Sequence, residues 1–175
     1  MNKPPDWLPP PLRYSDFNGD WDQFLAAVYK IFERDFKLSR PDYGGYPVAY
    51  DSKLEDGKEA AYWHVVSRDD PTTKDRELNL RRCERVAWVN PIIEHSTDKA
   101  VSMWKIEQKR PNRGRQVRVK LWLEDQDYIV ILTERPRGAV LVTAFCTDFE
   151  SERRKLRKER DDYLKTKQKP PSQAT

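Results

Sequence analysis

The chain has 175 residues, the size of a single domain, and its 33 Lys and Arg against 29 Asp and Glu give a net charge of +4. No stretch approaches the roughly 18 apolar residues that a membrane span needs, and the N-terminus lacks the apolar centre of a signal peptide. We therefore expect a cytoplasmic protein with no membrane partner. Cys83 and Cys146 lie far apart in apolar stretches, which predicts buried free thiols rather than a disulfide framework.

Prolines mark both ends of the chain, where seven of the thirteen lie within the first eleven residues or at positions 170 and 171. Such segments rarely form helices or central strands. We expect an extended N-terminus over residues 1–19, one α+β domain over 20–165 and a disordered tail over 166–175.

The first half of the chain contains one clear helix and two candidate strands. Apolar residues recur at spacings of three and four over 20–37, which predicts an amphipathic helix. Val48–Asp51 is a candidate short strand. The apolar run AAYWHVV (60–66), bounded by a Glu-Asp-Gly turn and by Ser67 and Arg68, predicts a second strand that carries His64.

The segment 72–96 reads as a helix that opens on a capping box at Thr72–Asp75 and is interrupted near Asn90-Pro91. Two stripes run along this predicted helix. Leu80, Cys83 and Ala87 form the stripe expected to face the core. Arg81, Arg85 and Trp88 line the other face.

The last third of the chain contains four apolar runs joined by short turns, at 101–107, 116–124, 127–134 and 139–145, followed by a charged segment at 149–165. Short connections make such strands antiparallel neighbours. The predicted fold is therefore α+β, with N-terminal helices packed on a four- to five-stranded antiparallel sheet and a charged C-terminal helix.

The charge distribution indicates a polyanionic partner. Residues 101–120 carry seven basic side chains and one acidic one, and residues 151–169 carry nine and four. Within 117–123 the valines and leucines alternate with Arg118, Lys120 and Trp122. An open sheet face with cations for phosphate and a ring for stacking suits RNA.

Most catalytic motifs are missing from the chain. It has no phosphate-binding glycine loop, no HExxH, no nucleophile elbow and no CxxC pair, and two histidines and two cysteines leave little for a zinc site. We expect no cofactor and no metal. RNA cleavage needs neither, because the 2′-hydroxyl attacks the adjacent phosphate and the protein supplies a base, an acid and cations.

His64, followed by Arg68 and an arginine-rich segment, has residue types that suit this chemistry. A lone histidine in an apolar strand is more often a core residue. His95, at an element boundary, and Thr143, in a strand, are also more often incidental than functional.

The segments together resemble the phage- and toxin-associated nucleases of the barnase–EndoU–colicin–RelE superfamily. The resemblance covers about residues 58–162 and rests on WHVVSR (63–68), DR…R…ER.AW…II (75–93), MW (103–104), LWLE (121–124), DYIVIL (127–132), VTAF.TD (142–148) and RRKLRKE (153–159).

This resemblance implies roles for particular residues. His64 would be the general base or acid, Arg68, Arg81 and Arg85 would hold the scissile phosphate, and Thr143 would position it. The partner acid stays open, with Glu94, His95 and Lys105 as candidates. Trp104 or Trp122 would stack a base. Together with Arg118 and Lys120 of the alternating strand and with Lys105, they are the predicted RNA-binding residues.

The sequence therefore predicts a metal-independent endoribonuclease, a toxin or phage-linked enzyme acting on tRNA or mRNA. A toxin would need a neutralising antitoxin or immunity protein as its partner. The alternatives are a non-catalytic RNA-binding module and an interaction protein with a basic docking tail.

Overall fold

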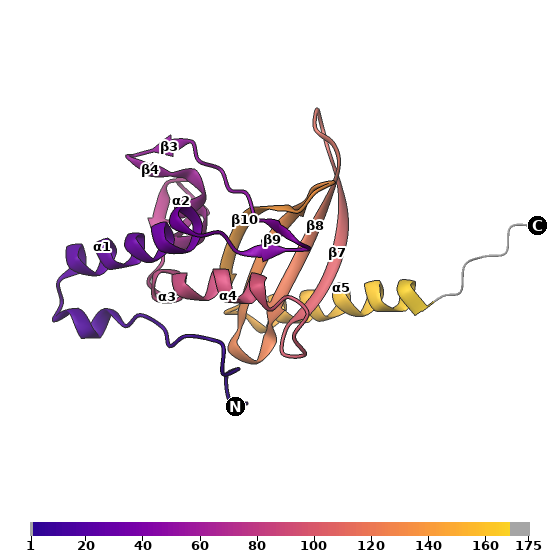
Figure 1. Cartoon of the computed structure of the whole chain (residues 1–175), viewed down its shortest axis with the longest axis horizontal. Helices are drawn as coiled ribbons and strands as arrows, with labels where there is room; N and C mark the ends of the chain where they lie inside the picture. The colour runs from indigo at the N-terminus through magenta and orange to yellow at the C-terminus, as the bar shows by residue number, and fades with distance from the viewer. Residues whose placement is uncertain (1, 169–175) are drawn as a thin grey trace, which may run out of the picture.

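The computed structural model describes residues 2–168, which form a four-stranded antiparallel sheet with helices on both of its faces (Figure 1). The strands are β7 (Ser102–Arg110), β8 (Gly114–Leu123), β9 (Tyr128–Glu134) and β10 (Ala139–Cys146), in the spatial order β10-β9-β8-β7. The predicted α+β fold is confirmed. Within these residues, no helix has both the length and the apolar character that crossing a bilayer requires.

The main core lies between the sheet and four helices. These are α1 (Trp21–Phe32), α2 (Ala60–Val66), α3 (Leu80–Glu84) and α4 (Val89–Glu94). Alternate residues of β8 point into this core, among them Val119, Leu121 and Leu123, as the sequence predicts. The helix predicted over 20–37 is confirmed as α1 and a π-helical turn, Glu33–Leu38, and both cysteines are buried free thiols.

The segment 60–66 forms α2, so its prediction as a strand is wrong. Tyr62, Val65 and Val66 are buried while His64 is exposed, which is the spacing of a helix with one face on the core. The β-branched valines favour strands in isolation, but packing of this face against β10 outweighs that preference.

The predicted helix over 72–96 is wrong in its first part. Ser67–Asp69 (β5) and Arg76–Leu78 (β6) pair as a hairpin, and the Asp70 carboxylate accepts hydrogen bonds from the next backbone N–H groups of its turn. Helix α3 then begins at its N-cap Asn79. The interruption comes at a 3-10 turn, Val86–Trp88, whereas Pro91 lies in the first turn of α4, where proline is tolerated.

Val48–Asp51 is not a strand. Ala49 makes an isolated parallel bridge to Val140 of β10. Two short hairpins flank this segment, β1 (Asp42–Tyr43) with β2 (Tyr46–Pro47) and β3 (Leu54–Glu55) with β4 (Lys58–Glu59).

The other face of the sheet is covered in part by α5 (Glu150–Gln168), seen behind the strands in Figure 1. Trp104, Trp122 and Ile129 form a second, smaller core with Leu156 of this helix. The predicted charged helix is confirmed, but the expectation that the face carrying Trp122 is open is wrong. Residues 166–168 are helical rather than disordered, and 169–175 lie outside the described residues.

The N-terminal segment is extended up to a 3-10 turn at Tyr14–Phe17, and it is attached to the body of the protein. The Leu12 backbone N–H donates to the Glu84 carbonyl at 2.7 Å, and the Trp88 indole donates to the Pro9 carbonyl at 2.8 Å. The segment therefore belongs to the folded domain.

Candidate functional site

A pocket of about 250 Å³ opens at the β10 edge of the sheet, between α2, the β5–β6 hairpin and α3. It is lined by Trp63, His64, Ser67, Arg68, Asp69, Arg76, Arg82 and Thr143. Three of the five residues predicted to be catalytic, His64, Arg68 and Thr143, therefore share one site.

His64 is exposed on the last turn of α2, where its ring is accessible from the pocket. The Thr143 hydroxyl donates a hydrogen bond to the His64 backbone carbonyl at 2.7 Å. This bond satisfies a carbonyl that the end of a helix leaves free. It also fixes the position of His64 relative to β10, and the Thr143 oxygen keeps its lone pairs for a ligand.

Three arginines line the pocket, and the charge of Arg82 is the least neutralised of the three. Its Nη1 donates to the Ser67 carbonyl at 2.5 Å, and its guanidinium lies 5.4 Å from the centre of the Phe145 ring. Burial lowers the pKa of Arg82. Within residues 2–168 it has no carboxylate within 4 Å, so its guanidinium has no direct ion-pair partner.

The other two arginines of the pocket differ in their partners. Arg68 is half exposed, and its Nε lies 4.0 Å from the Glu77 carboxylate, too far for a strong ion pair. Arg76 is held by Glu55 and lies 5.2 Å from the Trp63 ring centre. Arg68 is therefore free to meet a ligand, whereas Arg76 is already neutralised.

Arg81 and Arg85, both predicted to hold the phosphate, lie outside this pocket. Arg81 forms an ion pair with Asp148 at the start of α5. Arg85 donates to the Arg81 carbonyl at 3.1 Å and lies 5.1 Å from the Trp88 ring centre. Helix α3 begins at Leu80 and is only five residues long. With this start, Arg82 lies on the side of the helix that faces α2, and Arg81 does not.

The predicted RNA-binding cations are divided between the two faces of the sheet. Lys105 pairs with Glu134 at 2.9 Å, and its register partner Val119 points into the main core. Lys120 pairs with Glu159 of α5 at 2.7 Å. Arg118 is buried on the α5 side, beyond the part that this helix covers.

Trp104 and Trp122 are fully buried beneath α5. The Trp104 indole donates to Glu159 at 2.7 Å, and the Trp122 indole donates to the Thr147 hydroxyl at 3.4 Å. Neither ring is available to stack a base in this conformation.

The candidates for the partner acid also lie elsewhere. Glu94 accepts a hydrogen bond from the Asp42 backbone N–H at 2.7 Å. The His95 ring stacks on Trp7, with ring centres 4.4 Å apart. Asp69 is the one carboxylate that lines the pocket with His64.

Sequence reasoning missed Arg82, Arg76 and Asp69. The sequence signal for Arg76 and Asp69 was the Asp70-Pro71 dipeptide. This dipeptide is typical of a turn and would have predicted the β5–β6 hairpin that carries both residues. The signal for Arg82 was Asn79, a favourable N-cap that sets where α3 begins.

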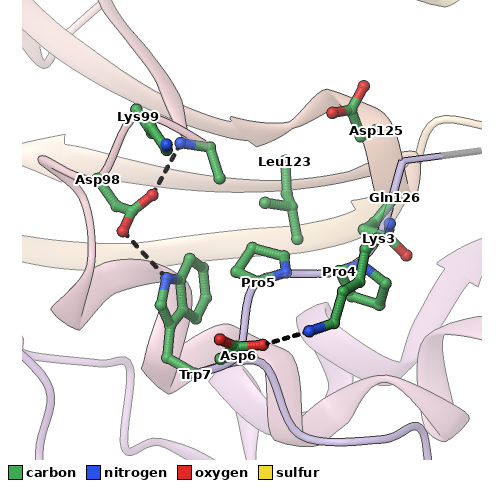
Figure 2. A pocket seen from close by; sticks show the side chains of 11 residues that line it. Lys3, Pro4, Pro5, Asp6, Trp7, Asp98, Lys99, Leu123, Asp125 and Gln126 are labelled. Carbon is green, nitrogen blue, oxygen red and sulfur yellow. Dashed lines mark hydrogen bonds and ion pairs between the residues drawn. The ribbon is translucent and has the colours of Figure 1, made fainter.

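A larger cavity of about 430 Å³ lies between the N-terminal segment, residues 98–100 and the turn that joins β8 to β9, and Figure 2 shows its lining. Two lysines and three aspartates are among its lining residues, and the Trp7 indole donates to Asp98 at 3.2 Å. Since its charges are mixed and none of the predicted site residues lines it, the smaller basic pocket is the stronger candidate site.

In the part of the chain that the structure describes, no group of three or more His, Cys, Asp or Glu side chains is placed to hold a metal ion. Comparison of the chain with protein-family models, with curated proteins and with solved structures found no match.

Proposed function

We propose that this protein is a metal-independent endoribonuclease whose active site is the pocket around His64. The observation that supports the proposal is the convergence of a histidine, two incompletely neutralised arginines and a threonine on one open, basic pocket. A general base beside cations that match phosphate is what transphosphorylation of RNA requires.

In the proposed reaction the His64 ring accepts the proton of a ribose 2′-hydroxyl. The 2′-oxygen attacks the adjacent phosphorus, the bond to the 5′-oxygen breaks, and a 2′,3′-cyclic phosphate forms. Arg68 and Arg82 stabilise the negative charge on the phosphorane oxygens. The departing 5′-oxygen takes its proton from water, because His64 is the only histidine among the residues that line the pocket.

The proposed substrate is tRNA or mRNA in the cytoplasm, a location that the two buried free thiols support. As a toxin or phage-linked nuclease, the protein would need a neutralising protein partner in its host.

A non-catalytic RNA-binding module is the second candidate function. The presence of a single histidine, with no second one to act as acid, favours it. A basic docking tail is less favoured, because Arg157 and Arg160 of α5 bind Glu124 within the chain.

The test is incubation of the wild type, His64→Ala and His95→Ala with total tRNA and a long mRNA, in the presence of EDTA. We expect discrete cuts with 2′,3′-cyclic phosphate ends from the wild type and from His95→Ala, and none from His64→Ala. His64 is exposed, so its variant should fold, which circular dichroism would check. Intact RNA from all three proteins, with RNA binding retained, would favour the binding module.

A further inference from the structure

Arg118 of β8 is a buried cation. Its exposed fraction is 8%, and Nη1 donates to the Thr133 hydroxyl of the neighbouring strand at 2.6 Å. No carboxylate of residues 2–168 lies within 4 Å of its guanidinium. Buried charges in proteins are normally paired, because leaving one unpaired is costly.

Two further arginines increase this uncompensated charge. Burial, and then the positive charges of Arg110 and Arg135, lower the pKa of Arg118. Arg110 ends β7, and Arg135 directly follows β9. The charges of Arg110 and Arg135 therefore act unfavourably on the charge of Arg118, so a bound anion would stabilise the arrangement.

The hairpin of β7 and β8 extends this basic region. We call residues 107–115 the basic arm, because all of them are exposed and the arm projects beyond β9 and β10 (Figure 1). Its one acid, Glu107, pairs with Arg115. Lys109, Arg110 and Arg113 have no carboxylate partner among the residues that the structure describes.

We propose that Arg110, Arg118 and Arg135 bind a phosphate group of a polynucleotide strand and that the basic arm holds the phosphates beyond it. The inference rests on the proposed function for the identity of the strand, which would be the RNA whose scissile phosphate lies beside His64. A row of arginines with a recessed, unpaired guanidinium suits the regularly spaced charges of such a backbone.

The side chains of Thr143, at the edge of the pocket, and of Arg118 lie on the same face of the sheet. Thr143 of the pocket pairs with Ile131 of β9, and Thr133, two residues further along that strand, pairs with Arg118 of β8. Thr143 and Arg118 are two strand spacings apart across the sheet and two residues apart along the strands. The diagonal between them is roughly 12 Å. At about 3.4 Å per nucleotide of a stacked strand, three or four nucleotides span this distance.

The experiment measures binding of a fluorescein-labelled, fully 2′-O-methylated 20-nucleotide RNA by anisotropy over a series of salt concentrations. This probe has no free 2′-hydroxyl, so binding is observed without cleavage. The test variant is Arg110→Gln/Arg135→Gln. The control is Arg154→Gln/Lys155→Gln, which removes the same charge from exposed positions of α5.

We expect the test variant to bind at least 10-fold more weakly at low salt, and the slope of log K against log salt to fall by about 0.7, the value for one lost phosphate contact on a single strand. The control should keep the wild-type slope. Equal losses of RNA affinity in both variants would show that the effect comes from net charge alone, and would overturn the proposal. Wild-type affinity in the test variant would overturn it as well.

Arg118→Met separates binding from folding. Replacing an uncompensated buried charge with an apolar side chain should leave the thermal unfolding midpoint unchanged or higher, while RNA binding weakens by about fivefold or more. A lower midpoint with unchanged binding would make Arg118 structural and overturn the proposal.

Failure of this proposal can be distinguished from failure of the proposed function. If the wild type cuts RNA and the Arg110→Gln/Arg135→Gln variant cuts and binds long RNA equally well, the nuclease proposal stands and the proposed phosphate site is wrong. If no protein cuts RNA but this variant loses salt-dependent binding, the phosphate site stands and the nuclease proposal is wrong.

Discussion

Two adjacent arginines of α3 have opposite surroundings. Arg81 is paired with Asp148, whereas Arg82 lies in the basic pocket and donates to the Ser67 carbonyl. A guanidinium that is already paired with a carboxylate binds a phosphate weakly. A guanidinium beside a pocket with no ion-pair partner can form strong, charge-assisted hydrogen bonds to a phosphate. In the proposed enzyme, the charge-stabilising role therefore belongs to Arg82.

Substitution of the two neighbours tests this assignment. Arg82→Gln should lower kcat/KM for RNA cleavage by about 10²-fold or more, because one stabilising donor is lost from the phosphorane oxygens. Its free energy of unfolding should change by only about 1 kcal/mol, the cost of leaving the Ser67 carbonyl without its donor. Cleavage kinetics and urea unfolding measure the two effects.

Arg81→Gln is the matched control, since it changes the same residue type one position away. It should keep kcat/KM within about twofold of the wild type, because it loses only a partly exposed ion pair. A loss of activity as large as that of Arg82→Gln would contradict the assignment.

At the scale of elements, α5 covers its part of the sheet mainly through polar contacts. Leu156 is its one buried residue, Tyr163 packs against the same small core, and the other contacts are mainly hydrogen bonds and ion pairs. Glu124, directly after β8, accepts hydrogen bonds from Arg157 at 2.6 Å and Arg160 at 2.7 Å. Partial burial raises the pKa of Glu124, but the hydrogen bonds and charges of the two arginines outweigh it and lower the pKa overall.

This lowered pKa predicts how the attachment of α5 depends on pH. A carboxylate with a lowered folded-state pKa contributes stability that is complete above its unfolded pKa, near 4.5, and is lost as the pH falls through the folded value. Glu124→Gln should therefore destabilise the protein by about 1 kcal/mol at pH 7, a modest value because the pair is partly exposed.

The difference between wild type and Glu124→Gln should persist down to about pH 5 and shrink below about pH 4.5. Urea unfolding followed by tryptophan fluorescence measures it, because Trp104 and Trp122 lie beneath α5. A difference that stays constant down to pH 3 would show that the charge of Glu124 does not hold the helix.

At the scale of the whole molecule, the N-terminal segment connects parts of the chain that are distant in sequence. Trp7 stacks on His95, Leu12 bonds to α3, and both side chains pack against the main core. A proline-rich segment loses little conformational entropy on docking, because proline already restricts the unfolded chain. The extended N-terminus is therefore part of the fold.

Deletion of residues 2–13 should lower the free energy of unfolding by about 2–4 kcal/mol, since several half-buried apolar side chains lose their contacts. The Trp88 indole also loses its acceptor, the Pro9 carbonyl. Denaturant unfolding measures the loss. Lys3→Ala/Asp6→Ala, which removes an exposed ion pair of the same segment, should have no measurable effect. If the deletion changes the free energy of unfolding no more than this control does, the segment contributes no stability.

Much of this protein was determined by its sequence alone, because the signals are local. The apolar alternation of β8, the three- and four-residue spacing of α1 and the short turns between the last four strands predict the α+β sheet and its order of elements. Residue type and the family resemblance predict His64, Arg68 and Thr143 as site residues, and the structure brings the three to one pocket.

The tertiary structure alone decided which neighbours complete that pocket and which surfaces stay open. Segment 60–66 is a helix because one of its faces packs on β10, a contact that local propensity does not contain. Arg82 replaces Arg81 because α3 begins at Leu80, and Trp104 is buried because α5 folds back over the sheet. Each of these outcomes depends on contacts between residues far apart in the chain, and the periodicity of a single segment carries no information about them.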